Sequence, residues 1–169
     1  KRMHKWTHYV DIYERHFSRF RGLSPVILEI GVFGGGSLAM WKHSFGAGAS
    51  VIGLDILPEC KAHEEEGVEV FIGSQDDGNV IDEILHHYPR IDIVLDDGSH
   101  QMHHMLRTFE LLYSCMSPHG VYMVEDTHTC YWDEFGGGLG REGTFLEGAK
   151  RLIDDINAVH SRGEVPVSS

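Results

Sequence analysis

Five short runs of apolar residues, separated by stretches of helical periodicity, constrain the fold of this chain more than any other feature. The runs are residues 26–30, 51–54, 68–72, 91–95 and 121–124. Each run is continuous rather than alternating, which is typical of parallel strands buried on both faces of a sheet. Strands that alternate with helices predict βαβ units with right-handed crossovers. The sequence therefore predicts a doubly wound α/β sheet.

The segments around these runs are predicted helices, at 8–20, 37–44, 58–66, 80–87, 101–116 and 144–159. The 101–116 segment has the clearest pattern, because Met105, Phe109 and Leu112 recur at the spacing of one helical face. Ser99 is its predicted N-cap.

A chain of 169 residues suits one domain. We expect a helical segment at 1–22, the sheet domain at 23–160 and a polar tail at 161–169. The apolar pattern supplies no sixth strand after the last helix. The sequence thus predicts either a short sheet or a chain that lacks its C-terminal part.

The charge balance excludes several classes of partner. With 14 basic and 26 acidic residues, the net charge of −12 disfavours nucleic acid, which requires a basic surface. The apolar runs are too short to cross a bilayer, so no membrane partner is predicted. Three cysteines without paired spacing indicate a reducing compartment, and we expect a cytoplasmic protein.

The first predicted strand ends in a glycine turn, Glu-Ile-Gly-Val-Phe-Gly-Gly-Gly-Ser at 29–37. The dinucleotide fingerprint G-x-G-x-x-G requires glycine at position 33, which is Phe33 here, and this disfavours a nicotinamide cofactor. A phosphate-binding P-loop requires a lysine after Gly36, where Ser37 stands. The acidic Glu29 before the first glycine is instead typical of S-adenosylmethionine (SAM) sites.

Two further strand ends carry groups suited to a nucleoside. Asp55, at the end of the second run, is placed to accept both hydroxyls of a ribose. Ser74, Gln75 and Asp76 follow the third run and are placed to meet an adenine edge. The alternative is that the glycines form only a tight turn and that Asp55 caps a helix.

Paired carboxylates close the fourth and fifth runs, as Asp96-Asp97 and Glu125-Asp126. Neighbouring strands lie about 4.8 Å apart, so these four groups would repel one another without a cation. Their hard oxygens suit Mg²⁺, which would bind and acidify a substrate hydroxyl, with His100 as the general base. Two questions stay open on spacing alone: whether Asp96 or Asp97 faces the metal, and whether these acids are only capping and loop residues.

A glycine-rich stretch at 135–140 follows Tyr131 and Trp132. It is interpreted as a mobile loop over the site, with the two aromatic side chains as apolar walls for a substrate. An ordinary linker into the last helix is an equal alternative.

Taken together, these motifs resemble the class I SAM-dependent, Mg²⁺-dependent O-methyltransferases of the mycinamicin and tylosin macrolide-sugar type. The related cephalosporin hydroxylase-type proteins are similar too. The most specific parts are Asp-Asp-Gly-Ser-His at 96–100 and Glu-Asp-Thr at 125–127, and the segment that starts at His4-Lys5-Trp6 also resembles this family. The resemblance covers nearly the whole chain, but family members usually carry two further antiparallel strands that are absent after 160.

The resemblance implies a role for each site residue and makes 23–160 a SAM-binding methyltransferase domain. It selects Asp97 over Asp96 as a metal ligand, together with Glu125 and Asp126, and makes His100 the base. The cofactor residues implied are Glu29, Gly31, Gly35 and Ser37 near the methionine moiety, Asp55 at the ribose, Ser74, Gln75 and Asp76 near adenine, and Asp96. Mg²⁺ and Mn²⁺ are not distinguished.

The resemblance predicts methyl transfer from SAM to a hydroxyl of a sugar attached to a natural product such as a macrolide, by a homo-oligomer. Neither the acceptor nor the position of its methylated hydroxyl follows from the sequence. Two alternatives are a nicotinamide-dependent oxidoreductase on a Rossmann-like fold and a SAM- or metal-binding module without catalysis.

Overall fold

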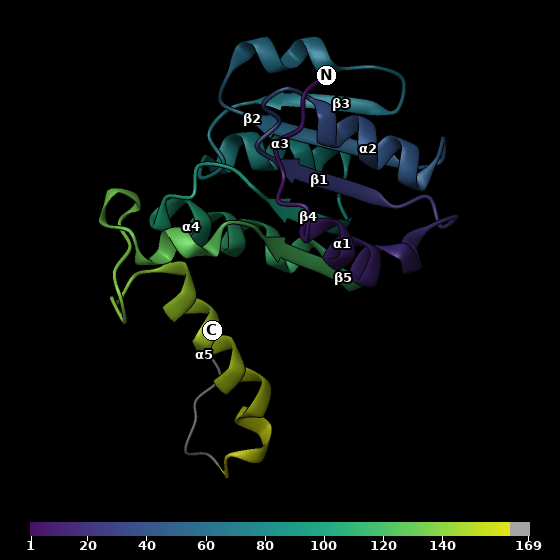
Figure 1. The fold of residues 1–169 in the computed structure, drawn as a ribbon. Helices are drawn as coiled ribbons and strands as arrows, with labels where there is room; N and C mark the ends of the chain where they lie inside the picture. The colour runs from purple at the N-terminus through teal and green to yellow at the C-terminus, as the bar shows by residue number, and fades with distance from the viewer. Residues whose placement is uncertain (163–169) are drawn as a thin grey trace.

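The computed structural model describes residues 1–162 and contains one parallel sheet in this range. Its strands are β1 (Val26–Ile30), β2 (Ser50–Asp55), β3 (Val68–Ile72), β4 (Ile91–Asp96) and β5 (Met116–Val124). They lie side by side in the order β3-β2-β1-β4-β5 (Figure 1). The predicted doubly wound sheet is confirmed. The strand order reverses between β1 and β4, and ligands of such sheets bind where the carboxyl ends diverge at this point.

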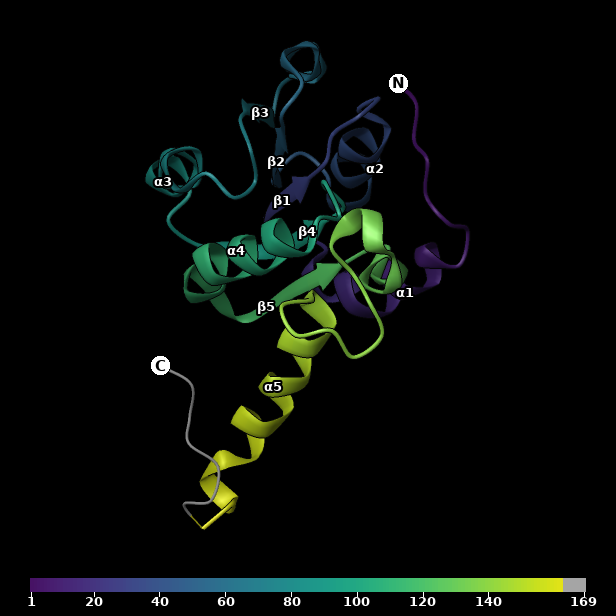
Figure 2. The ribbon, with the colours of Figure 1, turned by 90° about the vertical axis from the view of Figure 1, so that its left-hand side faces the viewer.

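Helices cover both faces of the sheet. The first two, α1 (Tyr9–Phe17) and α2 (Gly36–Phe45), lie on one face, and α3 (Gly78–His87) and α4 (Met102–Leu112) lie on the other (Figure 2). The last helix, α5 (Phe145–Asn157), extends away from the sheet and has no buried residue.

The strands are apolar throughout because each face of the sheet has its own core. Ile27 and Ile93 pack toward α1 and α2, whereas their neighbours Leu28 and Val94 pack toward α3 and α4. All four side chains are almost fully buried. This alternation with a period of two continues to the ends of the strands and determines the face on which each acidic side chain lies.

Several predicted boundaries are wrong, each for a local reason. The predicted helix at 58–66 is a 3₁₀ helix, η2 (Pro58–His63), because the chain must turn back through Gly67 to enter β3. Gln101, not Ser99, is the N-cap residue of α4. The Ser99 hydroxyl accepts a hydrogen bond from the backbone N–H of Gln101 at 3.2 Å.

The predicted helix at 101–116 is too long, and the fifth strand begins before residue 121. After α4 the chain forms a single 3₁₀ turn, η3 (Tyr113–Cys115), and then enters β5. Met116 pairs with Ile91 and Val121 with Ile93, so β5 contains a bulge. Pro118 lies within this bulge, where the missing proline N–H costs no regular ladder bond.

The four remaining predicted helices begin or end close to the predicted positions, and α2 and α3 lie within two residues of the helices predicted at 37–44 and 80–87. The helix predicted at 8–20 comprises α1 and a 3₁₀ turn, η1 (Ser18–Phe20). The helix predicted at 144–159 starts after its N-cap Thr144 and ends in a 3₁₀ turn, η6 (Ala158–His160). Most of the predicted polar tail lies outside the described residues. No helix in the described part of the chain combines the length and apolar character that crossing a bilayer requires.

Trp41 of α2 joins the helices to the strand that carries Glu29. Its indole packs edge-on against the rings of Tyr13 and Phe17, with centroids 5.0 and 5.6 Å away. Its Nε1–H donates to Glu29 Oε2 at 3.1 Å, and the side chain is 3 % exposed. Trp41 therefore contributes both apolar burial and a donor to a buried carboxylate.

We expect Trp41→Ala to lower the free energy of unfolding by about 3–5 kcal/mol, because it opens a cavity and removes this donor. Trp41→Phe keeps most of the packing and loses only the hydrogen bond, so a loss of about 1–3 kcal/mol is expected. Urea unfolding measures both, with Trp132→Ala, a half-exposed tryptophan, as the control. Equal losses in the phenylalanine and alanine variants would contradict the packing role.

Candidate active site

The acidic strand ends face two different sides of the sheet edge. Glu29, Asp97 and Glu125 lie on the side of α1 and α2, where they meet around one lysine side chain. Asp96 lies on the opposite side, next to Gln75 and α4. Alternation along β4 separates the adjacent carboxylates of Asp96 and Asp97, a distinction that spacing alone left open.

Lys5 is the centre of the first group. Its Nζ lies 2.8 Å from Asp97 Oδ2, 2.9 Å from Glu29 Oε1 and 3.1 Å from Glu125 Oε1. The lysine side chain is 4 % exposed and that of Glu29 is fully buried. Burial acts to lower the pKa of Lys5, but the three carboxylates outweigh it and raise the pKa well above its ordinary value. Lys5 is therefore a permanently charged ammonium inside an acidic cage.

Two tyrosines of α1 extend this group. Tyr13 donates from its hydroxyl to Glu125, and Tyr9 donates to Asp126 Oδ1 at 2.9 Å. Burial raises the pKa of Glu125 to about 7, and the nearby charge of Asp97 adds to this effect, while Lys5 opposes it. Tyr9 and Tyr13 are one helical turn apart, so α1 presents both hydroxyls to the acids after β5.

A second group, Asp97, His100 and Asp126, has ligand atoms within 4.8 Å of one another. His100 Nε2 lies 3.8 Å from Asp97 Oδ1 and 4.0 Å from Asp126 Oδ2. Both His100 and Asp126 have left-handed backbone conformations, with φ of 57° and 50°. Strained backbone of this kind is found at functional sites. Two carboxylates and an imidazole in this arrangement can hold a divalent cation.

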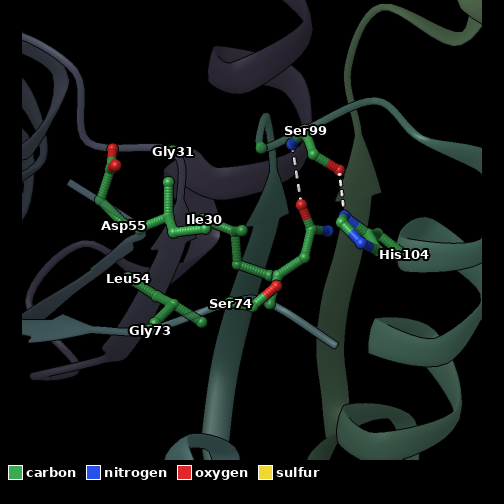
Figure 3. Close-up of a pocket in the computed structure, with 11 residues that line it drawn as sticks. Ile30, Gly31, Leu54, Asp55, Gly73, Ser74, Ser99 and His104 are labelled. Atoms are coloured by element: carbon green, nitrogen blue, oxygen red, sulfur yellow. Dashed lines mark hydrogen bonds between the residues drawn. The ribbon is translucent and has the colours of Figure 1, made fainter. Parts of the chain in front are cut away.

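The opposite side of the edge contains a cavity of about 160 Å³, which we call the sheet-edge cavity (Figure 3). It lies among the ends of β1, β2 and β3 and the loop after β4. Its lining includes Gly31, Asp55, Ser74, Gln75 and Ser99. The structure thus brings the predicted ribose residue, Asp55, and two of the three predicted adenine residues, Ser74 and Gln75, to one cavity, whereas Asp76 is not among the residues that line it.

Asp55 is held by the backbone around it. Its Oδ2 accepts from the N–H groups of Val32 and Phe33, at 2.8 and 3.0 Å, and its Oδ1 accepts from Leu57 at 2.9 Å. Partial burial acts to raise the pKa of Asp55, but these donors lower it below its ordinary value. The carboxylate is therefore ionised and fixed at the cavity.

Gln75 and Asp96 form the floor on the α4 side. Gln75 Nε2 donates to Asp96 Oδ1 at 3.1 Å and to Thr108 Oγ1 at 3.0 Å, while its Oε1 accepts from the Ser99 N–H at 2.8 Å. Burial raises the pKa of Asp96 to about 6. Ser74 bonds to Asp76 at the outer rim of the cavity. Gln75 therefore positions Asp96 and the loop after β4.

We call the N-terminal segment 1–7 the strap. A second cavity, of about 340 Å³, lies beside it and is called the strap cavity. Figure 1 shows the strap running from near β3 across to α1. Residues 2–5 line this strap cavity together with Ser37, Asp97, His100 and Asp126. Gly31, Asp55 and Gly98 line both cavities, so the two adjoin.

The glycines of the turn make room for other parts of this chain. A Cβ at Gly31, whose φ is 91°, would lie 2.1 Å from the backbone oxygen of Asp97. Cβ atoms at Gly34 and Gly36 would lie 2.7 and 2.5 Å from the backbone oxygen of Arg2. The space beside Gly35 is taken by His63. The glycines in the sequence indicated that something packs closely against this turn, but not that the strap is the segment that does so.

The predicted substrate residues Tyr131 and Trp132 are about half exposed. Tyr131 ends a 3₁₀ helix, η4 (Thr127–Tyr131), and Phe135 ends another, η5 (Asp133–Phe135). The centroid of the Phe135 ring lies 6.0 Å from that of Trp132 and 6.4 Å from that of His100. Trp132 is thereby linked to the His100 group through one aromatic ring.

Site residues that the sequence interpretation missed are Lys5, Tyr9, Tyr13 and Phe135. The strap carried a signal, because a lysine flanked by aromatic residues precedes tyrosines at i, i+4 spacing. Helical spacing shows that Tyr9 and Tyr13 share a face. It does not show which strand end that face meets.

We expect Gly31→Ala to lower the free energy of unfolding by at least about 3 kcal/mol, because the added methyl would overlap the backbone after β4. Gly46→Ala is the matched control. Gly46 also has a positive φ, of 80°, but nothing lies within 4 Å of its Cβ position, so about 1 kcal/mol is expected. Thermal unfolding measures the difference, and equal losses would show that backbone conformation alone matters.

Comparison with curated proteins finds O-methyltransferases. The chain is 42 % identical over 133 residues to the demethylmacrocin O-methyltransferase of Streptomyces fradiae, covering 74 % of this chain and 33 % of that protein. It is 41 % identical over 155 residues to the mycinamicin VI 2''-O-methyltransferase of Micromonospora griseorubida, covering 85 % of this chain and 38 % of that protein. The chain thus spans less than half the length of these relatives. No protein-family model matches it.

Among solved structures, the MycE methyltransferase of the mycinamycin biosynthetic pathway, in complex with Mg, SAH and mycinamycin VI, is 36 % identical. The TM-score is 0.85, and the match covers 98 % of this chain and 44 % of that one. The calicheamicin methyltransferase CalS11, at 13 % identity and a TM-score of 0.56, shares the fold. By sequence and by fold, the chain is homologous to the macrolide-sugar O-methyltransferases over the part that it spans.

Proposed function

We propose that this chain is the SAM-binding part of a Mg²⁺-dependent O-methyltransferase that acts on a sugar hydroxyl of a glycosylated natural product. The observation that carries the proposal is the group of Asp97, His100 and Asp126, which borders the strap cavity where it adjoins the sheet-edge cavity. The substrates for which the relatives are named support the substrate class.

The sheet-edge cavity fits the nucleoside of SAM. Asp55 lies at its rim as an ionised carboxylate, suited to two ribose hydroxyls. Ser74 and Gln75 lie beside the β3 end, where an adenine edge would meet them. The polar methionine end would extend past Gly31 toward the strap cavity. Phe33, exposed in place of the middle fingerprint glycine, disfavours a dinucleotide.

The group of Asp97, His100 and Asp126 fits Mg²⁺ by the chemistry of its donors, because two of the three groups are carboxylates. Asp97 and Asp126 are the ligands that we propose. Glu125, also predicted as a ligand, directs its Oε1 to Lys5 and Tyr13 here, and its role stays a prediction. Glu29 lies beneath Lys5, so its proposed role near the methionine moiety is through this lysine.

Bound SAM would supply an electrophilic methyl group, and Mg²⁺ held by Asp97 and Asp126 would make an acceptor hydroxyl more acidic. His100 would accept the proton of that hydroxyl at Nε2. The hydroxyl oxygen would then bond to the methyl carbon, and the electrons of the broken carbon–sulfur bond would return to sulfur. The carboxylates of Asp97 and Asp126 flank His100, with oxygens 3.8 and 4.0 Å from its Nε2. Much of the rate enhancement then comes from position and charge.

The acceptor is proposed to lie over the strap cavity with its apolar body against aromatic residues. The Phe135 ring lies near both His100 and Trp132, and Tyr131 and Trp132 are about half exposed. Trp6 lies on the strap, and its Nε1–H donates to Asp126 Oδ1 at 3.2 Å. Aromatic faces of this kind bind sugar rings and apolar macrocycles.

Titration with S-adenosylhomocysteine, with and without Mg²⁺, tests the cofactor. We expect binding of this compound and none of NAD. Asp55→Asn should weaken it about tenfold or more, since a hydrogen bond to a charged group contributes about 1.5–3 kcal/mol. Asp77→Asn is the matched control, because Asp77 also accepts a backbone N–H, from Asn79, but lines neither cavity. Binding of NAD instead would overturn the proposal.

Substitution of His100 shows whether this residue acts as the general base or as a ligand of the metal. We choose His100→Asn because asparagine tolerates the left-handed backbone at this position. A general base accounts for about a hundredfold or more, so methyl transfer to a glycosylated macrolide should fall by at least that factor while Mg²⁺ affinity is kept. A parallel loss of Mg²⁺ affinity would make His100 a ligand instead. Unchanged turnover would exclude both roles.

A further inference from the structure

The strap is attached to the glycine turn by backbone hydrogen bonds. The Arg2 N–H donates to Gly34 O, and the Gly36 N–H donates to Arg2 O, both at 3.0 Å. Before this point Lys1 pairs with Glu65 at 2.8 Å, and after it Trp6 bonds to Asp126. These contacts hold the strap on both sides of Lys5 and direct the Lys5 side chain inward.

Carboxylates surround Lys5. Its Nζ donates hydrogen bonds to Asp97 Oδ2 at 2.8 Å and to Glu125 Oε1 at 3.1 Å, and it forms an ion pair with Glu29 Oε1 at 2.9 Å. The carboxylates come from β1 and from the ends of β4 and β5, three neighbouring strands. One cation on the strap thus links the three strands at their carboxyl ends.

Lys5 lies beside the Asp97, His100 and Asp126 group rather than within it. It contacts Oδ2 of Asp97, whereas Oδ1 of the same carboxylate faces His100. A divalent cation held by that group would therefore share Asp97 with the ammonium. Four carboxylates, of Glu29, Asp97, Glu125 and Asp126, would then face two cations of different kinds.

We propose that Lys5 is a positioning residue that serves as the resident cation of the acidic site, neutralising Asp97 and Glu125 before metal binds and limiting the affinity of the site for Mg²⁺. The identity of the ion rests on the proposed function, and the neutralising role of Lys5 does not. Two cations close together repel each other, and in a partly buried site this repulsion is only weakly screened. Lys5 thus neutralises the carboxylates before metal binds and weakens metal binding.

The direction of the effect separates this role from a structural one. Loss of a side chain that only supports the site would disorder the carboxylates and weaken Mg²⁺ binding. Loss of a competing positive charge would strengthen it, because the carboxylates stay in place on three paired strands. Lys5→Met keeps the length and apolar stem of the side chain and removes only the charge.

The experiment is calorimetric titration of the purified protein with MgCl₂ alone. We expect Lys5→Met to bind Mg²⁺ about tenfold or more tightly than the unmodified protein, which corresponds to about 1.4 kcal/mol. Lys5→Arg retains the charge and should stay within about threefold. Lys1→Met, another strap lysine that pairs with an acid outside the cage, is the control. Unchanged or weaker binding by Lys5→Met would overturn the limit on affinity.

A metal-free measurement tests neutralisation by itself. Thermal unfolding in the presence of EDTA compares Lys5→Met, Glu29→Gln and the double variant. We expect Lys5→Met to be the least stable, because it leaves a buried carboxylate unpaired, and the double variant to regain part of the loss. Additive losses would overturn the pairing. Absence of Mg²⁺ binding by the unmodified protein would count against the proposed function. The comparison of the single and double variants in EDTA would still decide whether Lys5 neutralises Glu29.

Discussion

The alternation of side chains along the parallel strands governs the arrangement of the whole site. Because neighbouring residues of a strand face opposite sides of the sheet, Asp96 and Asp97 enter different environments. Asp96 meets Gln75 beside the sheet-edge cavity. Asp97 meets Lys5 and His100 on the side of α1. A one-residue shift of β4 would exchange the two carboxylates and separate the proposed metal group from the other acids.

Charge balance is the second constraint on this edge. Buried carboxylates are costly unless they are paired and hydrogen-bonded, and Glu29 and Glu125 are both buried. The strap supplies Lys5 to both carboxylates, and α1 supplies Tyr13 to Glu125 and Tyr9 to the adjacent Asp126. The N-terminal segment is thus part of the site even though it lies outside the sheet. It also forms one wall of the strap cavity.

Much of the fold could be predicted because buried strands have a distinctive sequence pattern. All five strands and the edge that carries their acidic ends followed from continuous apolar runs and their order. The ends of elements were less predictable. The bulge in β5 depends on pairing between Met116 and Ile91, and the 3₁₀ form of η2 depends on the turn into β3. Both are contacts between segments, which local periodicity does not contain.

The sequence by itself determined which chemical groups reach the carboxyl edge of the sheet. The apolar runs show the order of the strands along the chain, and the residues at the end of each run are the ones that reach this edge. Only the tertiary structure decided which of those groups meet. Lys5 is 92 residues from Asp97 in the chain and 120 residues from Glu125. Its ammonium joins them because the glycine turn binds the strap and α1 packs against Trp41. Spacing along a chain specifies local neighbours, whereas an ion pair between distant segments depends on how the whole chain packs.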